Sequence, residues 1–164
     1  MPGLLRVELP YASAGGALGL FLIVFATKPA IVDAVAKIVV PPISALPAIE
    51  TYLGRVDAGK IDEAWRLLDS EAKSGLAQDL DQLRRIYANA REPLGKVTNR
   101  TELGTNLVIS PAGYPLGAYR IISFRTRFAN GQCYLEAVSA RATSELEWRV
   151  YDHNINPQPI PCPP

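Results

Sequence analysis

Few residues in this sequence could do chemistry. His153 is the only histidine, and it stands between Asp152 and Asn154. Neighbours in sequence do not make a catalytic dyad, because acid–base catalysis needs the two groups to face each other in space. A lone histidine also falls short of the three or four ligands of a zinc site. We therefore interpret His153 as a surface or loop residue.

The two cysteines, Cys133 and Cys162, offer a second kind of chemistry. They lack the CxxC spacing typical of redox, zinc or haem sites. In an exported domain, two isolated cysteines can form one disulfide, which here would tie the C-terminal tail to a strand. The alternative is a pair of free thiols, and the sequence leaves both open.

Three arginines, Arg120, Arg125 and Arg127, form the densest basic patch. If this stretch is a strand, Arg125 and Arg127 share the face turned away from Phe124 and Phe128. They could meet an acidic partner or anionic lipid headgroups. The plainer interpretation is an ordinary solvated face of a sheet.

Other known signatures are absent from the sequence. Arg91 and Arg100 flank a Pro-Leu-Gly turn, and we expect them to pair with carboxylates and fix that turn. There is no Ser-His-Asp set, no phosphate-binding glycine loop and no carboxylate spacing like that of an EF-hand. The 17 basic and 16 acidic residues nearly balance, so there is no electrostatic case for nucleic acid. The sequence predicts no catalytic residue, cofactor or metal ion.

Residues 11–27 contain no charged side chain, and we expect this stretch to hold the domain that follows it at a membrane. As a helix it would rise about 25 Å, slightly less than the hydrocarbon core of about 30 Å. We expect an uncleaved single-pass anchor in the bilayer, continued by an amphipathic extension to Val40. A cleaved signal peptide, with Arg6 as its positive region, is the alternative. The residues expected to face the lipid or a partner helix are Gly15, Gly16, Gly19, Phe21 and Phe25.

The rest of the chain divides by composition and periodicity. We expect an anchor over residues 1–40, a proline-rich linker over 41–47, a domain over 48–153 and a proline-rich tail over 154–164. The tail reads as polyproline-like and is not expected to join a sheet. Helical spacing of apolar residues predicts helices over 48–56, 61–68 and 79–91, and residues 70–76 are expected to form a short helical or irregular piece. Period-two spacing predicts strands over 96–103, 107–110, 118–129, 132–142 and 145–151.

Helices followed by strands indicate an α+β fold, with the helices covering one face of a curved antiparallel sheet. Such a sheet often encloses a conical cavity, which is a candidate pocket. Alternation along the strands predicts that mainly Ile, Phe, Leu and Trp point into it. An enzyme would need titratable groups there instead.

Several segments together resemble the bacterial domain-of-unknown-function family 4019, a family of small exported proteins. The resemblance covers about Ala48 to Tyr151. It rests on residues 57–65, on 91–97 with Arg100, on 124–130, on Glu136 with Val138, and on 148–150. It implies a cone of the nuclear-transport-factor-2-like or cystatin-like kind and no activity.

The chain departs from the family pattern at both ends. Tyr151-Asp152-His153 replaces a common Gly-Tyr pair, and the long anchor and proline tail are additional. These departures suggest a common domain recruited to a membrane partner. We therefore expect a non-catalytic accessory subunit of a bacterial inner-membrane complex, respiratory or photosynthetic in type, with its domain in the periplasm. The alternative is a membrane-tethered module that binds a small molecule or lipid in the cone.

Overall fold

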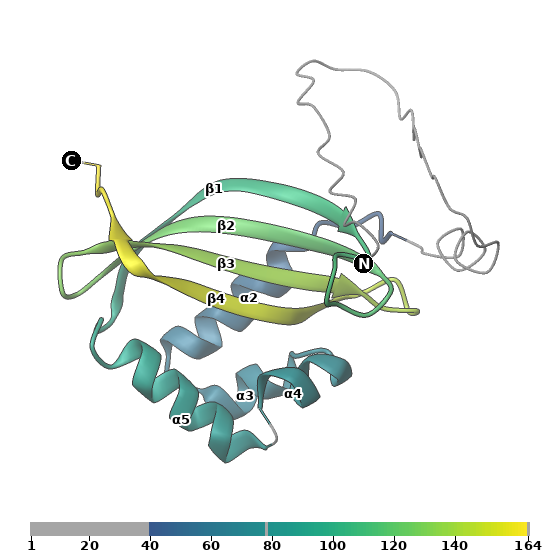
Figure 1. Cartoon of the computed structure of the whole chain (residues 1–164), viewed down its shortest axis with the longest axis horizontal. Coiled ribbons are helices and arrows are strands. Elements are labelled where there is room, and N and C mark those ends of the chain that lie inside the picture. The colour runs from purple at the N-terminus through teal and green to yellow at the C-terminus, as the bar shows by residue number, and fades with distance from the viewer. Residues whose placement is uncertain (1–39, 78, 164) are drawn as a thin grey trace, which may run out of the picture.

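The computed structural model describes residues 40–77 and 79–163. Within them, the helices precede the strands in the chain and pack on one side of a four-stranded antiparallel sheet (Figure 1). The predicted α+β class is confirmed. The elements are α2 (Leu46–Asp57), α3 (Ile61–Arg66), α4 (Ser70–Leu76), α5 (Leu80–Arg91), β1 (Val97–Ile109), β2 (Ala118–Phe128), β3 (Cys133–Ala142) and β4 (Trp148–Ile160).

Helix α2 supplies much of the core, because its apolar residues fall on one face. Ile49, Tyr52, Leu53 and Val56 are spaced by three and four positions, and all four are buried. They belong to one apolar cluster with residues of β2, β3 and β4. The helix ends at Asp57, and Gly59 with φ +71° makes the turn that follows.

The sheet is a meander with the strand order β1-β2-β3-β4. The two strands predicted over 96–103 and 107–110 are one strand, because an irregularity between Glu102 and Gly104 interrupts the alternation without ending the ladder. The tight turn predicted at Asn130-Gly131 joins β2 to β3, with Gly131 at φ +83°.

Strand β4 corrects the prediction for the tail. Its pairing with β3 continues through Pro159, opposite Tyr134, and ends with Ile160 opposite Cys133. A proline is tolerated here because β4 is an edge strand, and an edge residue has no second neighbour to which its missing N–H would donate. The proline-rich segment is therefore part of the sheet over most of its length.

The apolar stripe of α5 is only partly covered: Leu83 is buried, but Ile86 is 43% exposed. The linker contacts the domain, because Trp148 Nε1 donates a 2.8 Å hydrogen bond to Ile43 O. Pro47 lies in the first turn of α2, where its missing N–H costs nothing.

The predicted anchor, with Gly15, Gly16, Gly19, Phe21 and Phe25, lies outside the described residues. Over residues 40–77 and 79–163, the structure contains no helix with the length and apolar character needed to span a membrane.

Candidate functional site

The candidate site is built around a carboxylate in the core. Glu136, in β3, is fully buried on the face of the sheet that the helices cover. Its Oε1 accepts hydrogen bonds from His153 Nε2 at 2.9 Å and Arg91 Nη1 at 3.1 Å. Its Oε2 accepts from Arg100 Nε at 2.7 Å and Thr126 Oγ1 at 2.5 Å. Both oxygens are thus satisfied by residues of the same chain.

A second carboxylate holds the outer side of the same two arginines. Asp57, the last residue of α2, accepts a hydrogen bond from Arg91 and a 2.7 Å hydrogen bond from Arg100 Nη1. The two guanidinium groups lie between Glu136 on the inside and Asp57 toward the surface. Two positive and two negative charges therefore compensate one another, which is the condition for keeping them out of water. We call Asp57, Arg91, Arg100 and Glu136 the ionic cluster.

His153 connects this cluster to two phenols. Its Nδ1 lies 3.0 Å from the hydroxyl of Tyr87 and 3.3 Å from that of Tyr52, and the two hydroxyls also contact each other. With Nε2–H donating to Glu136, Nδ1 of a neutral imidazole is free to accept from a phenol. The His153 side chain is only 2% exposed. The interpretation of His153 as a surface or loop residue is therefore wrong.

The electrostatics of the cluster favour an ionised Glu136 and neutral phenols. Burial alone raises the pKa of Glu136, but the His153 hydrogen bond and the Arg100 charge outweigh it and hold that pKa well below its usual range. Burial raises the pKa of Tyr87 to about 12. Burial, with Tyr87 alongside, raises the pKa of Tyr52 well above its usual value. A satisfied carboxylate and neutral phenols suit a structural role rather than proton transfer near neutral pH.

Two adjoining clefts open beside the cluster, between α2 and β1. Each has a volume of about 370 Å³, and they share Leu46 and Glu102. The first is also lined by residues 41–44 and by Arg120; the second is lined by Glu50, Asp57 and Arg100 among others. The outer part of the ionic cluster therefore forms one wall of a cleft, whereas Glu136 lies behind it.

The structure separates the three arginines of the predicted patch. Arg120 lines a cleft on the helix-covered face, with its guanidinium carbon 6.0 Å from the centre of the Trp148 ring. Arg125 and Arg127 alternate with buried Phe124 and Phe128, so they lie on the open face as expected. The Arg125 Nε is buried and has no hydrogen-bond partner among the described residues. The three residues do not form one surface.

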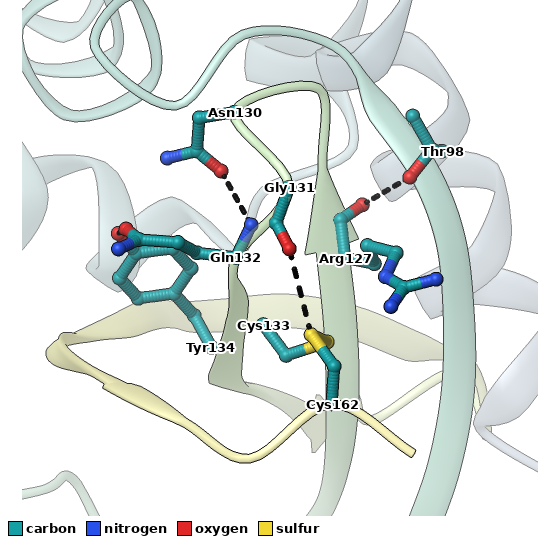
Figure 2. Close-up of a disulfide and its surroundings, with 8 residues drawn as sticks. All are labelled: Thr98, Arg127, Asn130, Gly131, Gln132, Cys133, Tyr134 and Cys162. Atoms are coloured by element: carbon teal, nitrogen blue, oxygen red, sulfur yellow. Dashed lines mark hydrogen bonds between the residues drawn. A yellow bond between two sulfur atoms is a disulfide. The ribbon is translucent and has the colours of Figure 1, made fainter. Parts of the chain in front are cut away.

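Of the other predicted residues, Arg91 and Arg100 do pair with carboxylates. They do so within the core, which goes beyond the turn they were expected to fix. Cys133 and Cys162 are joined in a disulfide, with their Cα atoms 5.4 Å apart (Figure 2). The bond lies beside the turn that joins β2 to β3, where Cys162 Sγ is 3.7 Å from Gly131 O. It fastens the segment just after β4 to the first residue of β3.

Sequence reasoning missed Glu136 and Asp57 as site residues. A signal was available for Glu136: alternation places it on the same face as Tyr134 and Val138, which are buried. A charge at such a position predicts a buried ion pair. Asp57 carried no comparable signal, because a polar residue at the end of a helix is ordinary.

The described part of the chain holds no group of three or more His, Cys, Asp or Glu placed to bind a metal ion.

In comparisons with known proteins, residues 48–152 match a family described as "Protein of unknown function (DUF4019)". No curated protein and no solved structure matches the chain.

Proposed function

We propose that this chain, which belongs to the DUF4019 family, is a non-catalytic accessory subunit of a bacterial membrane protein complex. In this proposal the residues before the linker tether the chain to the bilayer. The domain over 48–153 lies on the extracytoplasmic side and binds a partner polypeptide. The respiratory or photosynthetic type expected from the sequence is the class of complex we would search first.

The main support for the proposal is that the hydrogen-bonding groups of the ionic cluster are satisfied within the chain. Titratable groups do point into the core, which an enzyme would need. However, both oxygens of Glu136 accept hydrogen bonds from Arg91, Arg100, His153 and Thr126. A general base must have a lone pair free for the proton it abstracts. The cluster therefore supports a role in holding α2, α5, β1 and β3 together rather than in catalysis.

The disulfide supports the proposed location of the domain. Disulfides persist in oxidising compartments such as the periplasm and are rare in the cytosol. Cys133 and Cys162 are joined in a disulfide, and the described residues contain no free cysteine. An extracytoplasmic domain is consistent with this chemistry.

The position of the clefts supports partner binding close to the membrane. Pro41, Pro42, Ile43 and Ser44 line the first cleft, and they directly follow the segment that we expect to be the anchor. A partner embedded in the same bilayer would meet this side of the domain first. For the fold we propose the cystatin-like or nuclear-transport-factor-2-like kind of cone, to which helices on one face of an antiparallel sheet are suited.

The same clefts favour a second candidate function, a tethered module that binds a small molecule or lipid. Each volume of about 370 Å³ lies within the range of ligand sites. Leu46, Leu53 and Phe124 give the second cleft apolar walls, and its charged residues could orient a polar group. This function predicts a chain that runs alone and retains a bound molecule.

Native separation of membrane complexes distinguishes the two functions. Membranes solubilised in a mild detergent are resolved on a native gel, and the chain is located by an epitope tag at its C-terminus. The accessory-subunit proposal predicts migration with a large assembly at a fixed molar ratio. Migration as a free chain, with a small molecule detected in the extracted protein, would replace it with the second candidate.

A further inference from the structure

The two edges of the sheet differ in how they are protected. On β4, Pro157 and Pro159 interrupt the row of donors, and residues 67–69 bond to both backbone groups of Val150. Proline and a covering segment are common ways of blocking an edge. Strand β1 has 13 residues and contains neither proline nor lysine. Among the described residues, no strand pairs with its outer edge.

The free edge of β1 presents backbone donors and apolar side chains together. Ser110 N–H donates to Gly117 O at 2.8 Å, so the ladder toward β2 uses Ser110 and, by alternation, Val108. The N–H groups of Leu107 and Ile109 therefore point to the free edge. Leu107 is 38% exposed and Leu103 is 46% exposed. An added strand would find both hydrogen-bonding groups and apolar contacts here.

Beside this edge, two acidic side chains and one basic side chain lack ion-pair partners among the described residues, and they lie at different positions along the strand. Glu50 on α2 lines the second cleft and Glu102 on β1 lines both clefts, and neither carboxylate forms an ion pair with a described residue. Arg120 lines the first cleft and likewise has no carboxylate partner in the described part of the chain. Glu102 pairs with Phe124 and Leu107 pairs with Arg120. Glu102 therefore lies opposite Phe124, four residues along β2 from Arg120, which corresponds to about 13–14 Å along the strand direction.

We propose that the outer edge of β1 and the clefts beside it bind an extended strand of a partner polypeptide. The strand carries Lys or Arg between Glu50 and Glu102. Four residues away it carries Asp or Glu next to Arg120, with an apolar residue midway against Leu46. Strand addition to an exposed edge is an established mode of peptide recognition, in which backbone bonds give affinity and alternate side chains give specificity. This inference rests on the accessory-subunit proposal and names the partner segment.

Site-specific photocrosslinking of the full chain in its native membrane tests this inference. Leu107 is replaced by the photoreactive amino acid p-benzoylphenylalanine, and the crosslinked peptide is sequenced by mass spectrometry. The same replacement at Glu145, an exposed position in the β3–β4 connection, is the control. Glu102→Lys is then added to the Leu107 probe, with Glu145→Lys as the matched charge reversal. The thermal midpoint of each variant shows that it folds.

We expect a crosslink at Leu107 to a segment of another polypeptide with a basic and an acidic residue four positions apart. Glu102→Lys should lower its yield about tenfold, because the reversal replaces an attraction to the basic residue of the partner by a repulsion, and Glu145→Lys should leave the yield unchanged. A crosslink to a second copy of this chain or to lipid would overturn the inference. So would a segment without that spacing, an equal yield at Glu145, or no crosslink. If the chain still migrates with a large assembly, only this inference fails; if it migrates alone, the proposed function fails too.

Discussion

Replacing Glu136 by Gln removes the charge of the ionic cluster's inner carboxylate with little change of shape. In the wild type, the second carboxylate oxygen accepts hydrogen bonds from Arg100 Nε and Thr126 Oγ1. In the variant, the glutamine oxygen can still accept from two donors, but the NH₂ group takes the place of the second oxygen. This NH₂ group is itself a donor, so it cannot accept from Arg100 or Thr126. Removing one partner of a buried ion pair costs about 3–5 kcal/mol. Asp57 still compensates part of the arginine charge, so we expect about 3 kcal/mol. For a domain of this size that lowers the Tm by about 10 °C.

Guanidinium unfolding of the full chain, followed by tryptophan fluorescence, measures this loss. Glu147→Gln is the matched control: Glu147 pairs with Arg149 at 3.4 Å, but both side chains are exposed. We expect the control to change the free energy of unfolding by less than about 1 kcal/mol. If Glu136→Gln cost no more than its control, the cluster would not hold the fold together. The function inferred from its closure would then lose its basis.

The depressed pKa of Glu136 also predicts that the stability it contributes is present above about pH 4.3 and lost as the pH falls, so wild type and Glu136→Gln should converge in acid denaturant titrations. Burial raises the pKa of Tyr87 to about 12, so its contribution of about 2–3 kcal/mol should disappear as the pH rises from about 10 to 12, and Tyr87→Phe should show a smaller alkaline loss. Reducing the disulfide, which spans 29 residues, should lower the free energy of unfolding by about 3–4 kcal/mol, as measured with and without dithiothreitol. Gly95 has φ +77° and a Cβ there would meet a side-chain carbon at 3.0 Å, so Gly95→Ala should cost about 1–3 kcal/mol, whereas Gly104→Ala, in open space, should cost less than about 1 kcal/mol.

The parts of the fold with clear periodicity could be predicted from the sequence. The spacing of Ile49, Tyr52, Leu53 and Val56 indicates one buried face of a helix, and all four residues are buried. The Asn130-Gly131 turn is a strong local signal for a hairpin, and it is where β2 joins β3. Both signals are local, and the tertiary structure does not override them.

The extension of the last strand beyond Tyr151 could not be predicted, because the pattern of this segment depends on its place in the sheet. Proline excludes a central strand but is compatible with an edge, and the sequence does not show which strand is at the edge. An irregularity between Ser139 and Ala140 then shifts the register. Val150 faces the helices, and after the extra residue His153 does so too, opposite Val138. Without that shift, simple alternation from Val150 would point the side chains of Asp152 and Asn154 toward the helices and the side chain of His153 away from them.

The ionic cluster was only partly predictable for the same reason. Pairing of Arg91 and Arg100 with carboxylates was expected, but their partners lie on elements far apart in sequence. Alternation could have placed Glu136 inward. The identity of Asp57 as the outer carboxylate depends on how α2 lies on the sheet, which no local pattern encodes.

The native molecular mass of the tagged chain, with its molar ratio to comigrating proteins, tests the central claim most directly. It should be measured in mild detergent for the wild type and for Glu102→Lys and Glu145→Lys. The account predicts that the wild type and Glu145→Lys migrate at a fixed ratio with one large assembly, and that Glu102→Lys shifts toward the free chain. A wild-type chain that migrates alone would contradict the proposal that it is an accessory subunit.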